Sequence, residues 1–183
     1  MRRLEIKISG VGGQGVASLG NTLGRAAAFE GKYVAHSYSY GIGTRGGSSS
    51  SEVILSDTKI DYPFIIEADI AVIASEKVLG NALKVLKEGG LLIIDSDLVK
   101  TRSFSKKFKV AMIPAAKIAD SLGNRILTGI VALGGLVRCA EPVSKDSAIE
   151  AIKIYVPAAF REENITAFMK GMDAVDFLYG DVA

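Results

Sequence analysis

Cysteine is nearly absent from this sequence. The only one, Cys139, excludes an intrachain disulfide, and it also excludes a Cys-x-x-Cys metal site or an iron–sulfur cluster built by this chain alone. Cys139 lies within the apolar run 130–139, which predicts a buried thiol without a reactive role. We therefore expect this chain to bind no metal ion by itself.

Long apolar runs and an excess of one charge are missing as well. No segment reaches the ~18 uninterrupted apolar residues of a membrane span, and the start Met1-Arg2-Arg3 leads into an alternating pattern rather than a secretory signal. The 22 basic and 20 acidic side chains are scattered and give a net charge of +2, which excludes the basic field of a nucleic-acid-binding protein. We expect a cytoplasmic protein whose partners are neither membranes nor nucleic acids.

The length and composition that remain are typical of one globular domain covering residues 1–183. Alternating or nearly continuous apolar residues predict strands at 4–8, 33–36, 52–56, 69–74, 91–95 and 109–113. Helical spacing predicts helices at 14–30, at 78–86 with an end at Gly89-Gly90, and over most of the chain from Ala115, closing with an amphipathic helix over 162–178. The alternation predicts an α/β fold: a doubly wound, largely parallel sheet with helices on both faces and a helical C-terminal part.

A glycine-rich turn follows the first predicted strand. Gly10, Gly12 and Gly15 satisfy G-x-G-x-x-G between a strand and a helix, where backbone amides can hold a phosphate or another anion. A dinucleotide site also needs an acidic residue about 20 residues further on, yet residues 35–38 read Ala-His-Ser-Tyr. This argues against a stand-alone dinucleotide-binding oxidoreductase. Two explanations remain for the glycines. They allow a tight turn against the sheet, or they form a contact with another subunit or a cofactor.

A second glycine-rich loop is predicted at residues 37–51. Its length exceeds that of an ordinary α/β connection, which indicates a functional loop. Arg45 stands among glycines and serines, where its guanidinium can bind a carboxylate or a phosphate. A solvated arginine on a surface loop is the alternative.

Together these motifs resemble the gamma subunits of 2-oxoacid:ferredoxin oxidoreductases. Residues 12–16 read G-G-Q-G-V, as in the opening of that family, and Tyr40-Gly41 through Arg45-Gly46-Gly47 is similar to its Y-G-P-E-x-R-G-G loop. The resemblance continues in order and spacing at 52–57, 60–63 and 68–69, and at Asn164, Ala167, Phe168 and Gly171, which match a final N-x-x-A-F-x-x-G pattern. Ile42 and Gly43 depart from it, since they replace a Pro and a Glu of many relatives.

The resemblance implies an accessory subunit rather than a complete enzyme. In this family thiamine diphosphate attacks a 2-oxoacid, carbon dioxide leaves, electrons pass through iron–sulfur clusters to ferredoxin, and coenzyme A accepts the acyl group. Thiamine diphosphate, Mg²⁺, iron–sulfur clusters and coenzyme A are thus expected in the complex and not on this chain alone. The partners implied are alpha and beta subunits, with a delta subunit left open, and ferredoxin through the complex. The loop sequence Arg-Gly-Gly-Ser is more similar to the 2-oxoglutarate type than to the pyruvate type, while branched-chain and indolepyruvate types stay open.

No catalytic residue is predicted, because the single histidine, His36, has no evident partner carboxylate. The residues expected at a subunit interface or at the approach of coenzyme A are Gly12, Gly13, Gln14, Gly15, Tyr40, Gly41, Arg45, Gly46, Gly47 and Ser48. A stand-alone oxidoreductase and an interaction module without a redox role are the competing hypotheses.

Overall fold

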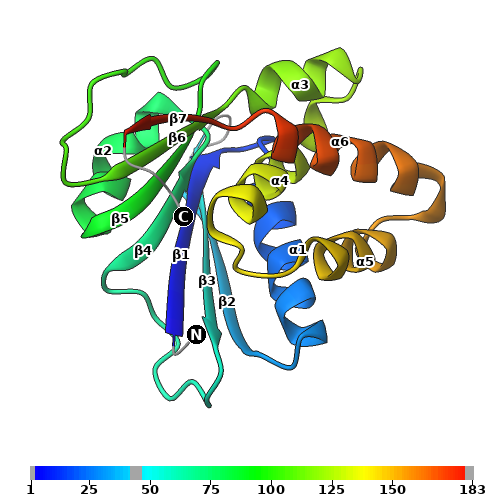
Figure 1. Cartoon of the computed structure of the whole chain (residues 1–183), viewed down its shortest axis with the longest axis horizontal. Coiled ribbons are helices and arrows are strands. Elements are labelled where there is room, and N and C mark those ends of the chain that lie inside the picture. Colours follow the sequence, from blue (N-terminus) through cyan, green and yellow to red (C-terminus); the bar gives the residue numbers. More distant parts are fainter. Residues whose placement is uncertain (1–2, 42–46, 180–183) are drawn as a thin grey trace.

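The computed structural model describes residues 3–41 and 47–179, and a seven-stranded sheet forms the centre of this part (Figure 1). The strands are β1 (Arg3–Val11), β2 (Tyr33–Tyr40), β3 (Ser48–Ser56), β4 (Ala68–Ile73), β5 (Leu86–Asp95), β6 (Lys109–Ile113) and β7 (Asp176–Tyr179), in the order β2-β3-β1-β4-β5-β6-β7. Strands β1, β4, β5 and β6 are parallel neighbours, whereas β3 and β7 run against them. Because β2 is antiparallel to β3, it shares the direction of β1. The predicted α/β fold with a largely parallel sheet is confirmed.

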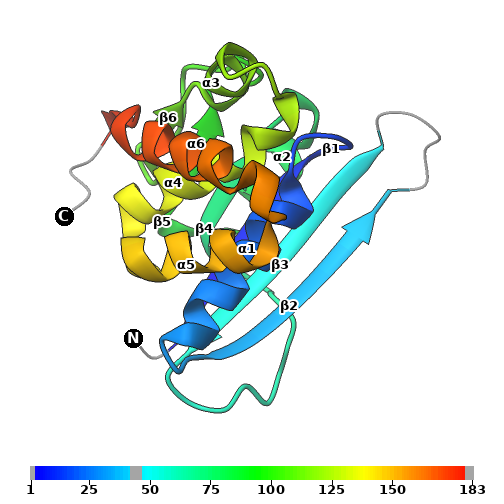
Figure 2. The ribbon, with the colours of Figure 1, turned by 90° about the vertical axis from the view of Figure 1, so that its right-hand side faces the viewer.

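Most helices cover one face of the sheet (Figures 1 and 2). They are α1 (Val16–Phe29), α3 (Ala115–Ser121), α4 (Thr128–Ala140), α5 (Lys145–Tyr155) and α6 (Arg161–Asp173), with the 3-10 turns η1 (Arg125–Leu127) and η2 (Ala158–Phe160) between them. Alternate strand residues such as Ile6 and Ile8 point to this face, where they are buried with Leu19 and Leu23 of α1. Burial of this continuous apolar layer is the main source of stability on this side.

In the described part of the chain, the opposite face carries one helix, α2 (Glu76–Val85), which packs on β4 and lies beside β1. Ile73, Leu92 and Ile94 are buried there against Val78 of α2. The segment between β5 and β6 contributes Phe104 to the same cluster. The prediction of helices on both faces is thus confirmed, although one face is covered by more helices than the other.

Two predicted helix ends were wrong. Helix α2 ends at Val85 rather than at Gly89-Gly90, because Leu86 is extended (φ −78°, ψ 125°) and pairs with Ala68 as the start of β5. The last helix ends at Asp173 rather than near residue 178, because Phe177 pairs with Ala111 and the chain adds β7 to the edge of the sheet. Aromatic residues favour such extended pairing. In the described ranges no helix has the length and apolar character to cross a bilayer.

The second predicted loop is shorter than expected. Strand β2 continues to Tyr40 and β3 begins at Ser48, so the connection spans 41–47 instead of 37–51. The serine-rich stretch forms a strand because it pairs with β1 on one side and with β2 on the other. Ser51 is buried and its Oγ lies 2.7 Å from Nε2 of His36. A β-carbon at Gly20 of α1 would collide with the Ser51 hydroxyl, so glycine permits this close approach of helix and sheet.

Candidate functional site

The glycine-rich turn connects β1 to α1 at the carboxyl edge of the parallel strands. Gly13 and Gly15 have φ values of 87° and 71°, a conformation that favours glycine. The side chain of Gln14 folds back, and its Oε1 accepts a hydrogen bond from the Val11 amide at 2.7 Å. Helix α1 then begins at Val16 without a side-chain cap. The amides of its first turn are consequently directed toward the space in front of the turn.

The two glycine-rich segments meet at this edge. The amide of Gly12 donates to the carbonyl of Gly47 at 3.3 Å, and the amide of Gly41 donates to the carbonyl of Ser48 at 2.6 Å. The two segments that the sequence analysis singled out are therefore in direct contact. Arg45 and Gly46, together with Ile42 and Gly43, lie outside the described residues.

An open groove of about 230 Å³ runs between the glycine turn and the end of the β2–β3 hairpin. It is lined by Val11, Gly13, Gln14, Gly15, Val16, Ala17, Ser18, Tyr38, Tyr40, Ser49 and Ile126. Four of these residues were expected at the site, namely Gly13, Gln14, Gly15 and Tyr40. Gly12, Gly41, Gly47 and Ser48 lie beside the groove through the backbone contacts above.

A tyrosine pair forms one wall of the groove. The rings of Tyr38 and Tyr40 meet edge to face, with centroids 4.4 Å apart. Burial raises the pKa of Tyr38 to about 12, the Tyr40 hydroxyl adds to the rise, and a hydrogen bond with Ser49 opposes it. Tyr38 therefore stays neutral at physiological pH and acts as a hydrogen-bonding group rather than as a base.

Ile126 forms the opposite wall and was missed by the sequence analysis. It belongs to η1, the residue is 71% exposed, and it lines both this groove and a neighbouring one. The second groove has about 350 Å³ and also contains Tyr155 and Phe160. No local signal marks Ile126, because η1 is brought to the glycine turn only by the packing of α4.

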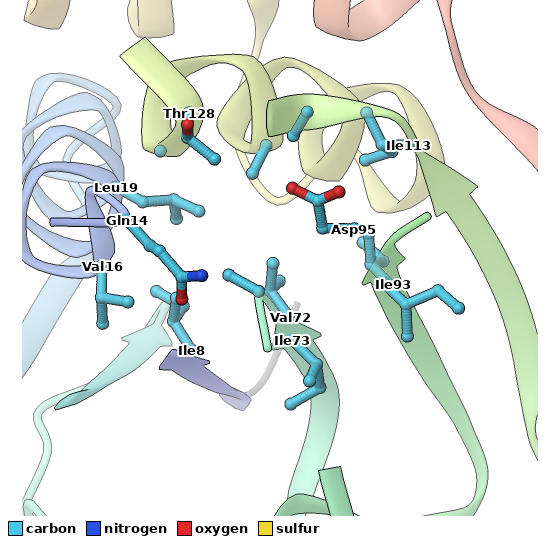
Figure 3. A pocket seen from close by; sticks show the side chains of 15 residues that line it. Ile8, Gln14, Val16, Leu19, Val72, Ile73, Ile93, Asp95, Ile113 and Thr128 are labelled. Atoms are coloured by element: carbon cyan, nitrogen blue, oxygen red, sulfur yellow. The ribbon is translucent and has the colours of Figure 1, made fainter. Parts of the chain in front are cut away.

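Behind the turn, a small internal cavity lies between the ends of β1, β4, β5 and β6 (Figure 3). Figure 3 shows the Gln14 side chain reaching toward Ile8 and Val72, with Asp95 at the far side. The cavity volume is about 20 Å³, which is room for about one water molecule. Most of its lining is apolar, with Gln14, Asp95 and Thr128 as the polar exceptions.

Asp95 is a buried carboxylate at the end of β5. Its Oδ1 accepts from the Asp97 amide and its Oδ2 from the Ala116 amide, each at 2.9 Å. Burial raises the pKa of Asp95, and the two backbone hydrogen bonds oppose that rise. These contacts tie the start of α3 to the sheet edge, which gives Asp95 a structural role that the sequence did not reveal.

The packing of α4 closes the crevice in which open α/β sheets usually bind nucleotides. A β-carbon on Gly15 would lie 2.6 Å from the Gly129 amide nitrogen, so α1 and α4 touch through their backbones. Ligand pockets usually measure ~300–1,000 Å³, far more than the space left behind Gln14. The geometry therefore disfavours a dinucleotide at this position, and close packing explains the third glycine of the motif.

The remaining candidates for chemistry are structural. Cys139 is buried as predicted, and burial raises its pKa to about 11. Burial lowers the pKa of His36, whose ring is hydrogen-bonded to Ser51. Within residues 3–41 and 47–179, no three His, Cys, Asp or Glu side chains gather so that they could hold a metal ion.

Comparisons with known proteins agree on one family. The model of the family described as "Pyruvate ferredoxin/flavodoxin oxidoreductase" matches residues 5–174. The chain is 41% identical over 174 residues to a 2-oxoglutarate synthase subunit KorC from Methanocaldococcus jannaschii, covering 93% of both chains. It is 32% identical over 153 residues to a ketoisovalerate oxidoreductase subunit VorA from Methanothermobacter marburgensis, covering 80% of this chain and 31% of that protein.

A solved structure shares the whole fold. It is the crystal structure of the gamma subunit of a keto/oxoacid ferredoxin oxidoreductase from Geobacter sulfurreducens PCA. The TM-score is 0.83 with 35% sequence identity, and the match covers 95% of this chain and 97% of that one.

Proposed function

Because this chain belongs to the pyruvate ferredoxin/flavodoxin oxidoreductase family, we propose that it is the gamma subunit of a 2-oxoacid:ferredoxin oxidoreductase, with residues 1–183 as one gamma-type domain. The observation that carries this function is the match to a 2-oxoglutarate synthase subunit over 93% of both chains. In the complex a 2-oxoacid is oxidatively decarboxylated to an acyl-CoA and the electrons pass to ferredoxin.

We propose 2-oxoglutarate as the substrate of that complex. The identity to the 2-oxoglutarate synthase subunit is 41%, against 32% to the ketoisovalerate enzyme subunit. The Arg-Gly-Gly-Ser sequence of the second loop supports the same choice. The acyl product would then be succinyl-CoA.

The cofactors of the reaction fit other chains better than this one. Thiamine diphosphate is held through Mg²⁺, and iron–sulfur clusters need several thiolates. This chain has one cysteine, which is buried, and its described residues form no cluster of metal ligands. We therefore assign this subunit no chemical step, and its role is to dock on the thiamine-bearing alpha and beta chains.

We propose that docking uses the surface around the two glycine-rich segments, called here the docking face. It comprises the groove beside Tyr40 and the adjoining groove at Ile126, Tyr155 and Phe160. Tyr40 and Ile126 are 72% and 71% exposed, and Phe160 is 52% exposed. Exposed apolar and aromatic side chains gathered on one surface are typical of protein interfaces.

Reconstitution tests the proposed function. With its alpha and beta partners, this chain should support reduction of ferredoxin or a viologen by 2-oxoglutarate and coenzyme A, with lower rates for pyruvate and branched-chain acids. The chain alone should show no turnover. A complex that keeps full activity when this chain is omitted would refute the proposal.

A narrower proposal concerns Arg45. We expect its guanidinium to help shape the approach of coenzyme A across the subunit boundary, since an arginine binds phosphates through paired hydrogen bonds. Arg45→Ala should raise the KM for coenzyme A by about tenfold, the loss of one charge-assisted contact, or weaken assembly by a similar factor. Arg45→Lys is the matched control and should have a smaller effect. Unchanged KM and unchanged assembly in Arg45→Ala would exclude this role.

A further inference from the structure

The two edge strands of the sheet differ in how well they are protected against pairing with a strand of another chain. The edge strand β7 has four residues, includes the acidic Asp176, and pairs with β6 through an irregular register. These features discourage pairing with another strand. The other edge strand, β2, has eight residues, Tyr-Val-Ala-His-Ser-Tyr-Ser-Tyr, without proline, glycine, lysine or any carboxylate. Strand β2 thus lacks the residues that usually prevent an edge strand from pairing with another chain.

Strand β2 is also long and regular. It pairs with β3 from Tyr33 opposite Ser56 to Tyr40 opposite Ser49, with no shift of register. Figure 2 shows β2 as the outermost strand, and in the described part of the chain no further strand lies beside it. Eight extended residues span about 27 Å, so a row of backbone amides and carbonyls of that length faces outward. A second strand is the structure that satisfies such a row most completely.

The side chains on β2 suit pairing with an identical strand. Its register with β3 places Val34, His36, Tyr38 and Tyr40 on the helix-covered face, and Ala35, Ser37 and Ser39 on the other face together with the exposed Tyr33. In an antiparallel pair related by a two-fold axis perpendicular to the sheet, residues of the same face stand opposite each other. With the axis at Ser37, Val34 would meet Tyr40 of the second copy, and Ala35 would meet its Ser39.

Strand β2 itself brings no charge to this pairing. Every residue of β2 is uncharged when His36 is neutral, and burial lowers the pKa of His36. The His36 ring is hydrogen-bonded to Ser51 of its own chain, so it needs no partner across the edge. A β-branched residue opposite an aromatic one is a favourable cross-strand pair, and on the open face the small Ala35 and Ser39 stand opposite each other without a steric clash.

We propose that β2 is a self-association edge, through which two copies of this chain join their sheets into one continuous sheet with β2 beside β2 at its centre. The occupant of the edge is a second copy because the uncharged strand complements itself on both faces. The exposed position of Ser37 and Ser39 agrees with this use. The proposal goes beyond the assignment as a gamma subunit and does not depend on it.

Opposite charges at the two-fold axis provide a sharp test. The full chain should sediment and elute at twice its mass of 19.3 kDa. Ser37→Lys and Ser37→Glu each place two like charges side by side at the axis, so each variant alone should dimerise at least about tenfold more weakly. Mixed in equal amounts, the two variants should form a dimer again, because a lysine then stands opposite a glutamate.

The control is Asp176→Lys on β7, which alters charge at the other edge and should leave the dimer mass unchanged. Circular dichroism verifies that each variant keeps its fold. The proposal is overturned if the wild-type chain is monomeric at every concentration reached, if neither Ser37 variant weakens the dimer, or if the mixture of the two stays monomeric. Activity of the reconstituted complex is a separate readout, so failure of this proposal and failure of the gamma-subunit assignment are distinguishable.

Discussion

Gly171→Val is expected to destabilise the chain by about 3 kcal/mol or more, because this glycine lies where α6 crosses α4 with the backbones in contact. A β-carbon at Gly171 would collide with the carbonyl oxygen of Val131 and lie 3.0 Å from its Cα. On α4, a β-carbon at Gly134 would likewise collide with the Phe168 carbonyl and lie 2.9 Å from the Met172 amide nitrogen. Since all these atoms belong to the backbone, no side-chain rearrangement can relieve the overlap, and the helices must separate.

Urea and thermal unfolding followed by circular dichroism measure this effect. For a chain of this size, the loss corresponds to a decrease in Tm of roughly 6–12 °C. The control is Gly80→Ala on α2, where a β-carbon meets nothing within 4 Å. Removing a glycine from an exposed position of a helix should stabilise the chain by about 0.5–1 kcal/mol. A Gly171→Val chain as stable as the wild type would show that α4 and α6 are not in backbone contact.

Ile126→Asp is expected to prevent incorporation of this chain into the complex. Ile126 projects from η1 at the junction of the two grooves of the docking face, and the residue is 71% exposed in the free chain. If a partner covers this position, the aspartate becomes a buried charge without a partner, which costs about 3–5 kcal/mol. The affinity for the alpha and beta chains should therefore fall by a factor of roughly 150 to 4,000. Because Ile126 is exposed, the fold should be retained.

Ile66→Asp is a matched control for this measurement. Ile66 is 72% exposed, nearly the same as Ile126, but it lies between β3 and β4 at the opposite end of the sheet. Co-purification of the tagged chain with its partners, together with 2-oxoglutarate-dependent viologen reduction, should separate the two variants. If Ile126→Asp assembles as well as Ile66→Asp, the docking face lies elsewhere on the molecule.

The sequence predicted the parts of the fold that depend on local patterns. The alternation of Leu4, Ile6 and Ile8 identified β1, and the continuous apolar run at 91–95 identified the buried part of β5. Such patterns succeed because burial of one face repeats with the period of the element itself. The ends of elements were less predictable. Whether the chain after Ala174 remains helical or adds a strand depends on the free edge of β6, which the local sequence does not reveal.

By itself, then, the sequence determined the order of the strands from β1 to β6 and, through two glycine-rich motifs in register, the family to which the chain belongs. Only the tertiary structure decided how the glycines are used. Gly15 meets Gly129, a residue of a helix far along the chain, and this contact closes the crevice that the motif alone would have assigned to a nucleotide. The same packing brings Ile126 to the glycine turn. Local periodicity depends on neighbours within a few residues, whereas a surface depends on which distant segments share the same side of the sheet.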